Sequence, residues 1–280
     1  MKKCLVFADT TRERVRVALE QALPLIRQHV DVERYDLAVA DDHECGPADF
    51  AIVFGGDGSI LRVARILGCR QVPVVGVNIG KFGFLAEINP EQLHRAIDKL
   101  ASGDFEVVPR MMLRCRATRE GQVLRESLAL NDAVISRSAR SRMISIGLLI
   151  DDEQVTDYNG DGIIISTPVG STAHSLAAGG SILEPSLRAF AITPICPHTL
   201  SNRPLVIPAE HTIQLVVQRA EVAVGLTMDG QVYSDLQMGD RVLIRRAEQD
   251  FHLIQTGTRS YYETLRSKLG WGGHPNYGIR

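Results

Sequence analysis

Short apolar runs alternate with helical segments over the first hundred residues, and this alternation constrains the fold more than any other feature. The strand-like runs are residues 4–7, 50–54 and 72–77, and the helical segments are residues 59–67 and 90–100. A further helix is predicted to run to about residue 30 with Thr10 or Thr11 as its N-cap, and Pro24 predicts a kink or an early end of this helix. Strands and helices in this order predict a parallel, doubly wound α/β sheet.

The pattern changes near Val107, where short alternating or β-branched segments begin to dominate and continue to about residue 255. The predicted strands include residues 143–150, 162–166, 212–218, 222–226 and 241–244. One helix is predicted over residues 171–178, and residues 260–269 are helical in composition. The second part of the chain is therefore predicted to be β-rich, a sandwich or a similar fold.

The composition excludes several classes of protein. The 280 residues are 45% hydrophobic and 23% charged, which is ordinary for a globular chain long enough for two domains. A net charge of −2 argues against a general nucleic-acid-binding surface. The five cysteines form no CxxC, the first apolar run is too short for a signal peptide, and no run reaches membrane-spanning length. We therefore expect a cytoplasmic protein without disulfides, a zinc site or a membrane partner.

The sequence GGDGS at residues 55–59 follows a buried strand and precedes a helix. Glycines in such a turn let backbone N–H groups approach phosphate oxygens, and the helix N-terminus favours anions. Asp57 repels phosphate, so its presence suggests work on a hydroxyl group or on magnesium beside the phosphates. The structural alternative is a tight strand-to-helix turn with Asp57 near an N-cap.

Two commoner phosphate-binding motifs are absent. No GK[ST] follows a glycine-rich loop, which excludes a Walker A site. Gly56 and Gly58 begin a GxGxxG motif, but Leu61 occupies the place of the third glycine. Val77 and Asn78 lie where a dehydrogenase would carry an acidic residue for the ribose, so an ordinary dinucleotide dehydrogenase is disfavoured.

Two polar residues, Asn131 and Asp132, interrupt the strand-like run at residues 127–135. Polar side chains in such a run need partners from protein, water or ligand. An amide can recognise an adenine edge and a carboxylate can bind a ribose diol. The alternative, which is the stronger one for the pair alone, is a bulge or strand end in which Asn and Asp form a turn.

Residues 161–175 (DGIIISTPVGSTAHS) form the third candidate site. A buried strand leads into a Pro/Gly turn, after which Ser and Thr residues open a helix, and this places free N–H groups and hydroxyls together for a phosphate or a base. The alternative is an ordinary capped helix. His174 is interpreted as a contact residue, not as a base. Cys196 and His198 lack a third ligand nearby and are interpreted as structural.

Together, the GGDGS loop, the Asn-Asp pair and the DG-x-x-x-STP-x-GSTA segment resemble the NAD kinase family in residue type and order. Residues 193–205 (TPICPHTLSNRPL) match a later family segment, and the resemblance extends over residues 4 to 255. It implies an α/β domain over residues 1–106 plus a C-terminal helix at about 258–280. It also implies a β-sandwich-like, dinucleotide-binding domain over residues 107–257.

The resemblance implies phosphoryl transfer from ATP or another donor to the 2′-hydroxyl of the adenosine ribose of NAD, which makes NADP. Asp57 is then the catalytic proton acceptor, and Mg²⁺ accompanies ATP without a protein ligand that can be named. The implied NAD contacts are Asp57, Gly58, Asn131, Asp132, Arg142, Asn159, Asp161, Thr172, Ala173, His174, Ser175, Leu176, Ala177 and Gln231. The implied ATP-phosphate loop is Gly55, Gly56, Gly58 and Ser59. NAD is expected between the domains of a homodimer or homotetramer whose neighbouring subunit completes the site.

The chain departs from the family pattern at four positions. Asp132 replaces the commoner Glu, Val169 stands where Thr or Ser is usual, His174 replaces Tyr, and Asn159 stands where Arg is frequent. Two rival functions remain open at this stage. One is a lipid or sugar kinase that uses the same GGDG loop, and the other is a non-catalytic dinucleotide sensor.

Overall fold

The alternating strands and helices build one six-stranded sheet in the first of two units into which the chain divides. The computed structural model describes residues 1–39, 45–80, 83–137, 143–198, 202–257 and 260–271. The first unit comprises Met1–Val108 and His252–Arg280, and the second comprises Pro109–Phe251. The sheet order is β2 (Asp31–Asp36), β1 (Lys3–Ala8), β3 (Phe50–Gly55), β4 (Val74–Asn78), β18 (Phe251–Gln255) and β5 (Glu106–Arg110).

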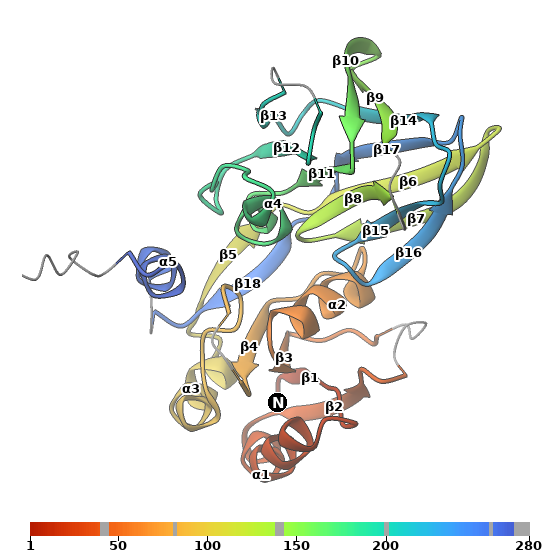
Figure 1. Ribbon diagram of the computed structural model, residues 1–280. Coiled ribbons are helices and arrows are strands. Elements are labelled where there is room, and N and C mark those ends of the chain that lie inside the picture. Colours follow the sequence, from red (N-terminus) through yellow and green to blue (C-terminus); the bar gives the residue numbers. More distant parts are fainter. Residues whose placement is uncertain (40–44, 81–82, 138–142, 199–201, 258–259, 272–280) are drawn as a thin grey trace, which may run out of the picture. The chain divides into compact units, whose positions relative to one another are not determined.

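The first four of these strands are parallel, and β18 pairs in parallel with β4 (Figure 1). The helices of this unit are α1 (Glu13–His29), α2 (Asp57–Leu67), α3 (Pro90–Ser102) and α5 (Tyr261–Leu269). Chain order reverses at the border of β1 and β3, because β1 leads to β2 on one side and β3 lies on the other. The predicted doubly wound α/β sheet is therefore confirmed, and its switch point lies where such sheets bind ligands.

Helices cover both faces of this sheet. Alternate strand residues such as Val6, Ile52 and Val75 share one core with the apolar sides of α1 and α3. Gly76 faces the opposite way, and a Cβ built on it would lie 2.5 Å from Ile60 of α2. The strands are buried on both sides, which explains why they appear in the sequence as continuous apolar runs.

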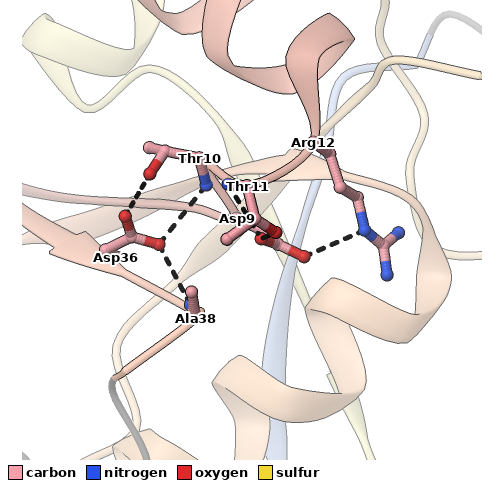
Figure 2. Close-up of polar contacts among 6 residues, drawn as sticks. All are labelled: Asp9, Thr10, Thr11, Arg12, Asp36 and Ala38. Atoms are coloured by element: carbon pink, nitrogen blue, oxygen red, sulfur yellow. Dashed lines mark hydrogen bonds and ion pairs between the residues drawn. The ribbon is translucent and has the colours of Figure 1, made fainter.

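The start of α1 differs from the sequence prediction. Its N-cap is Arg12, whose side chain makes no capping hydrogen bond. The Thr11 hydroxyl donates to Asp9 (2.5 Å), and the Thr10 hydroxyl donates to Asp36, as Figure 2 shows. The two threonines therefore shape the turn between β1 and the helix and do not cap it.

Pro24 does not end α1, which continues to His29. The prediction of an early end was wrong because Leu19 and Ala22 before the proline and Ile26 after it are all buried against the core. Their burial outweighs the roughly 3 kcal/mol that an interior proline costs.

The other three helices of the first unit begin close to where the sequence predicts. Helix α2 starts at Asp57, two residues before the predicted start at Ser59. Asn89 caps α3 and Ser260 caps α5, each in a capping box with the third helical residue, Gln92 and Glu263 respectively. The apolar residues Leu93, Ile97 and Leu100 of α3 are buried.

The second unit consists of two six-stranded antiparallel sheets around one core. One sheet has the order β10 (Glu153–Gly160), β9 (Ile144–Ile150), β14 (Ile213–Arg219), β17 (Arg241–Arg246), β6 (Leu113–Arg119) and β7 (Gln122–Ala129). The other has the order β13 (Leu205–Pro208), β12 (Ala189–Ile195), β11 (Gly162–Ser166), β8 (Asp132–Arg137), β15 (Val224–Met228) and β16 (Val232–Leu236). Inward side chains of both sheets, among them Cys115, Ile163 and Leu215, form a single apolar cluster. The predicted β-sandwich-like domain is thus confirmed.

One local prediction in this unit was wrong, and one alternative was confirmed. Instead of one helix over residues 171–178, the chain forms a 3₁₀ turn at Gly170–Thr172 and a single α-helical turn, α4, at His174–Ala177. The strand-like run at residues 127–135 is divided between β7 and β8, so Asn131 lies in the turn between them, as the alternative of a strand end for the Asn-Asp pair predicted. No helix within the described parts of the chain is long and apolar enough to cross a membrane.

Candidate functional site

Asp57 lies at the carboxyl edge of the first unit's sheet, where the chain turns from β3 into α2. Gly56 is the N-cap, and Asp57 is the first helical residue and is partly exposed. Gly55 has a φ of 156°, in the range that favours glycine, and the Ser59 side chain occupies the space where a Cβ on Gly55 would lie. The glycines of the loop therefore allow the abrupt strand-to-helix turn that presents the Asp57 carboxylate at the sheet edge.

Three consecutive backbone N–H groups hold the Asp57 carboxylate. Phe84 donates to Oδ2 at 2.7 Å, and Leu85 and Ala86 donate to Oδ1 at 3.0 and 3.2 Å. Gly83 makes this approach possible, since a Cβ there would lie 1.9 Å from Asp57 Oδ1. The orientation of the carboxylate is thus set by a segment that follows the neighbouring strand β4.

This arrangement distinguishes the two carboxylate oxygens of Asp57. A carboxylate offers about four lone-pair positions, two on each oxygen. The donors within the described residues occupy two positions on Oδ1 and one on Oδ2. Oδ2 therefore keeps one acceptor position, the position that a ligand hydroxyl can use.

In the second unit, the Asn131 turn is held by a buried carboxylate from a distant part of the sequence. Asp229 accepts hydrogen bonds from the N–H groups of Leu130 (3.1 Å), Asn131 (2.7 Å) and Asp132 (3.3 Å). Asp229 itself has a φ of 53°, and its N–H donates to the carbonyl of Asp132 at 2.9 Å. The backbone of the Asn-Asp pair is thereby fixed, which leaves the Asn131 side chain for other partners.

The same turn contacts the STP-x-GST segment. Thr167 donates its N–H to the Asn131 carbonyl at 2.8 Å and its hydroxyl to the Leu130 carbonyl at 2.5 Å. Gly170 lies so close that a Cβ there would be 2.1 Å from the Asn131 carbonyl oxygen. The second and third sequence motifs therefore meet in the folded unit, 36 residues apart between Asn131 and Thr167.

Asp132 is the buried member of the pair, with 4% of its surface exposed. Burial, and secondarily the nearby charge of Asp229, raises the pKa of the Asp132 carboxyl to about 7. Its Cα partner across the sheet is Ser166, whose buried hydroxyl has no hydrogen-bond partner among the described residues. The site thus contains a carboxyl group that changes charge near neutral pH.

The remaining predicted contacts around α4 differ in exposure. The Ser175 hydroxyl is buried and shares a hydrogen bond of 2.9 Å with the Thr193 hydroxyl. Thr172 and Leu176 are partly buried, whereas Ala173, His174 and Ala177 are exposed. Gln231 is exposed and is the last residue of the hairpin turn that begins at Asp229. Arg142 lies outside the described residues.

Asp161 and Asn159 are not brought together with Asn131 and Asp132. They precede β11, whereas Ser166, the partner of Asp132, ends it. The five steps along the strand from Asp161 to Ser166 span roughly 16 Å. Arg137 binds Asp161 through Nε at 2.7 Å and holds the pKa of that carboxyl below its usual value. Arg137 and Asp161 thus form an ion pair at the other end of β11, and Asn159 lies near the end of β10, two residues before Asp161.

Sequence reasoning missed two contributors to this geometry. The first is the Phe84–Leu85–Ala86 backbone, which carries no side-chain signal for its role. The second is Asp229, whose Asp-Gly pair with Gly230 indicates only a turn. The one sequence signal for its role is its place in a tight turn two residues before Gln231. The three N–H groups that donate to its carboxylate lie 97 to 99 residues earlier in the chain.

An α/β unit with an aspartate in a GGDG turn, followed by an all-β sandwich, defines a kinase of the GGDG class. Residues 4–105 match the ATP-NAD kinase N-terminal domain, and residues 130–256 match the ATP-NAD kinase C-terminal domain. The chain therefore belongs to the NAD kinase family.

Individual relatives agree with this assignment. The chain is 41% identical over 283 residues to the NAD kinase of Geotalea daltonii, covering 97% of this chain and 99% of the relative. It is 44% identical over 225 residues to the NAD kinase of Geobacter sulfurreducens, covering 80% and 79%.

Two solved structures have the same fold. An NAD kinase from Archaeoglobus fulgidus in complex with ATP has a TM-score of 0.76 at 27% identity and covers 98% of this chain and 100% of that chain. Yeast NADH kinase complexed with NADH has a TM-score of 0.85 at 24% identity, covers 98% of this chain and 89% of that chain, and supports the fold alone.

Proposed function

We propose that this chain transfers a phosphoryl group from ATP to the 2′-hydroxyl of the adenosine ribose of NAD, with Asp57 as the proton acceptor. The observation that carries the proposal is the Asp57 carboxylate, which is held by three backbone N–H groups and keeps one acceptor position on Oδ2. The identity of the substrates, ATP and NAD, is inferred from membership of the NAD kinase family. The family and the matching C-terminal domain disfavour a lipid or sugar kinase.

The proposed reaction uses the free position on Oδ2. The 2′-hydroxyl of the ribose donates its hydrogen bond to Oδ2, and the 2′-oxygen attacks the γ-phosphorus of ATP. The new bond joins the 2′-oxygen to phosphorus, the bond from phosphorus to the β–γ bridging oxygen breaks, and ADP leaves. The hydroxyl proton passes to Oδ2 of Asp57. Because Phe84, Leu85 and Ala86 prevent the carboxylate from rotating, the acceptor is oriented before the substrate arrives.

The second unit supplies the proposed dinucleotide contacts. Asp229 and Thr167 bind the backbone around Asn131, which leaves the side-chain amide of Asn131 to donate to and accept from an adenine edge. Asp132, with a pKa of about 7, can accept from a ribose hydroxyl when ionised and donate when protonated. Thr172, Ala173, His174, Leu176 and Ala177 provide exposed or partly exposed surface for the rest of the ligand.

Magnesium fits this site as a partner of the ATP phosphates. The described residues hold no group of three or more His, Cys, Asp or Glu side chains arranged for a metal. Asp57 has most of its acceptor positions taken by N–H donors. Mg²⁺ would supply charge neutralisation on the transferring phosphoryl group, and the loop Gly55, Gly56, Gly58 and Ser59 at the start of α2 would lie beside the phosphates.

A homo-oligomer and a cytoplasmic location also belong to this proposal. The polar residues Asn159 and Asp161 lie at the far end of β11 from Asp132. This position suits a contact with the ligand of a neighbouring subunit. A homodimer or homotetramer would provide that neighbour. All five cysteines are free, which supports a reducing compartment.

The decisive experiment measures NADP formation from NAD, ATP and magnesium by the wild type and by Asp57→Asn. The variant should turn over at least about 100-fold more slowly while binding NAD with unchanged affinity. Asp49→Asn is the matched control, since Asp49 precedes the same strand at its opposite end and binds the Lys3 N–H at 2.7 Å.

Three outcomes would contradict the proposal. A near-normal rate for Asp57→Asn would remove the proton-acceptor role. NAD binding by the wild type without any NADP formed would support the sensor. Preferential phosphorylation of a sugar or lipid would support the other kinase class.

A further inference from the structure

The N–H groups that hold Asp57 belong to the loop that follows β4, and the C-terminal end of this loop is hydrogen-bonded back to β4. The Asn78 N–H donates to the Ile88 carbonyl at 2.7 Å, and the Ile88 N–H donates to the Gly76 carbonyl at 3.3 Å. Ile88 also forms an isolated parallel bridge with Val77. These contacts close the loop at its base, one residue after Glu87.

Glu87 connects this loop to a distant part of the sequence. Its Oε2 accepts a hydrogen bond from the Thr256 N–H at 3.0 Å and another from the Thr256 hydroxyl at 3.2 Å. Thr256 directly follows β18, the strand that pairs with β4, and lies 169 residues after Glu87. A carboxylate that receives two donors from one residue links the loop to the end of the neighbouring strand.

Only one peptide unit separates Glu87 from the nearest of the N–H groups that donate to the Asp57 carboxylate. Ala86, whose N–H binds Asp57 Oδ1, precedes Glu87, so a shift at Glu87 moves the Ala86 and Leu85 amides. The Asp57 carboxylate follows these amides because they occupy both acceptor positions of Oδ1. The Glu87–Thr256 contact and the closed base therefore act on the same short segment from its C-terminal side.

We propose that Glu87, held by Thr256, is a positioning residue that sets the orientation of the Asp57 carboxylate through the amides of residues 84–86. This inference rests on the proposed function, in which Asp57 accepts the ribose proton. Small displacements of a proton acceptor lower the rate of the chemical step more than they weaken substrate binding. Glu87 does not touch the substrates in this proposal.

The test compares Glu87→Ala and Thr256→Val with the wild type in steady-state assays with NAD, ATP and magnesium. Each variant should lower kcat by about threefold to thirtyfold, with the KM values for NAD and ATP within about twofold. Thr256→Ser retains both donors and should restore kcat. The double variant should lose less than the product of the two single effects, because the hydroxyl contact that Thr256→Val removes is one of the two contacts that Glu87→Ala removes.

Glu33→Gln is the matched control in the same sheet. Glu33 lies on β2, which β1 and β3 separate from β4, and it pairs with Lys3 at 2.7 Å. The Glu33→Gln substitution should leave kcat unchanged. Thermal unfolding of every variant checks that the fold is retained, and if Glu87→Ala does not fold, Thr256→Val and Thr256→Ser carry the test.

The decisive measurement adds Glu87→Ala to Asp57→Asn. A residue that acts through Asp57 should not slow the Asp57→Asn variant further. An equal loss of kcat in both backgrounds, or a normal kcat in Glu87→Ala and Thr256→Val, would overturn the positioning role. If Asp57→Asn itself turns over normally, the proposed function fails first, so the two failures are distinguishable.

Discussion

The Asn131 N–H donates to Asp229 Oδ1 at 2.7 Å across 98 residues of sequence. This contact, with those from Leu130 and Asp132, fixes the geometry of a turn that the Asn-Asp pair alone only indicates. A buried carboxylate with three backbone donors is difficult to replace, since its loss leaves those N–H groups without a partner. The relation explains how two separate motifs, the Asn-Asp pair and the Asp-Gly turn, serve one site.

Asp229→Asn should therefore weaken both folding and NAD binding. The new amide group places N–H hydrogens against backbone N–H donors, and we expect a loss of about 1–3 kcal/mol of stability. The KM for NAD should rise by about tenfold, because the Asn131 turn loses its fixed geometry. Chemical denaturation and steady-state kinetics would measure the two effects.

Asp151→Asn is the control for this prediction. Asp151 also has a positive φ, 49°, and binds the Thr212 N–H at 2.8 Å, but it lies in the exposed turn between β9 and β10. The same substitution there should leave the KM for NAD unchanged. Equal KM changes in both variants would show that the Asp229 contact has no special effect on binding.

The raised pKa of Asp132 predicts a pH-dependent stability. Its pKa is about 7 in the folded protein and near 3.8 in the unfolded chain. Between these values the folded state binds more protons, so the free energy of unfolding falls as pH rises from about 4 to 7, and the contribution is level above that. Asp132→Asn removes this titration and should gain stability over the wild type between pH 5 and pH 8, on the order of 2–4 kcal/mol.

Denaturant titrations of both proteins at several pH values would measure this difference. Asp152→Asn, at an exposed position in the turn after β9, serves as the control and should parallel the wild type. Parallel curves for wild type and Asp132→Asn would contradict the raised pKa.

Local patterns predicted the elements whose burial is visible in the sequence. The run at residues 50–54 is buried on both faces, so β3 was evident, and the GGDG loop follows it directly. The apolar spacing of α3 was equally clear, because Leu93, Ile97 and Leu100 face one core. Asp57 was identifiable for the same reason, since its motif is contiguous.

The rest depended on contacts that a local pattern does not carry. Asn131 ends a strand because Asp229 and Thr167 bind the turn around it, and both lie far away in the sequence. The residues that orient Asp57 contribute backbone N–H groups, so their side chains give no indication. The helix predicted over residues 171–178 is broken because Ser171 and Ser175 turn inward to buried partners.

Replacement of Pro24 should stabilise the first unit. Pro24 is exposed inside α1, where it lacks the N–H that would bond to the carbonyl four residues earlier. Pro24→Ala should raise stability by at least about 1 kcal/mol, as judged by denaturant unfolding. Gln21→Ala, another exposed position of the helix, should change stability by less than about 0.5 kcal/mol. A destabilised Pro24→Ala variant would mean that the proline fits a bend on which the packing of α1 depends.

Gly83 provides the most direct test of how Asp57 is held. A methyl group at this position would lie 1.9 Å from Asp57 Oδ1, closer than any real contact, so the carboxylate or the segment of residues 84–86 must move. Gly83→Ala should lower kcat by about tenfold to a hundredfold with little change in the KM for NAD. Gly80→Ala in the same loop is the control, because a Cβ there meets no atom of the described residues within 4 Å. Since the two substitutions add the same methyl group to one loop, an equal loss in both would attribute the effect to loop stiffness, whereas a loss confined to Gly83→Ala places it at the carboxylate.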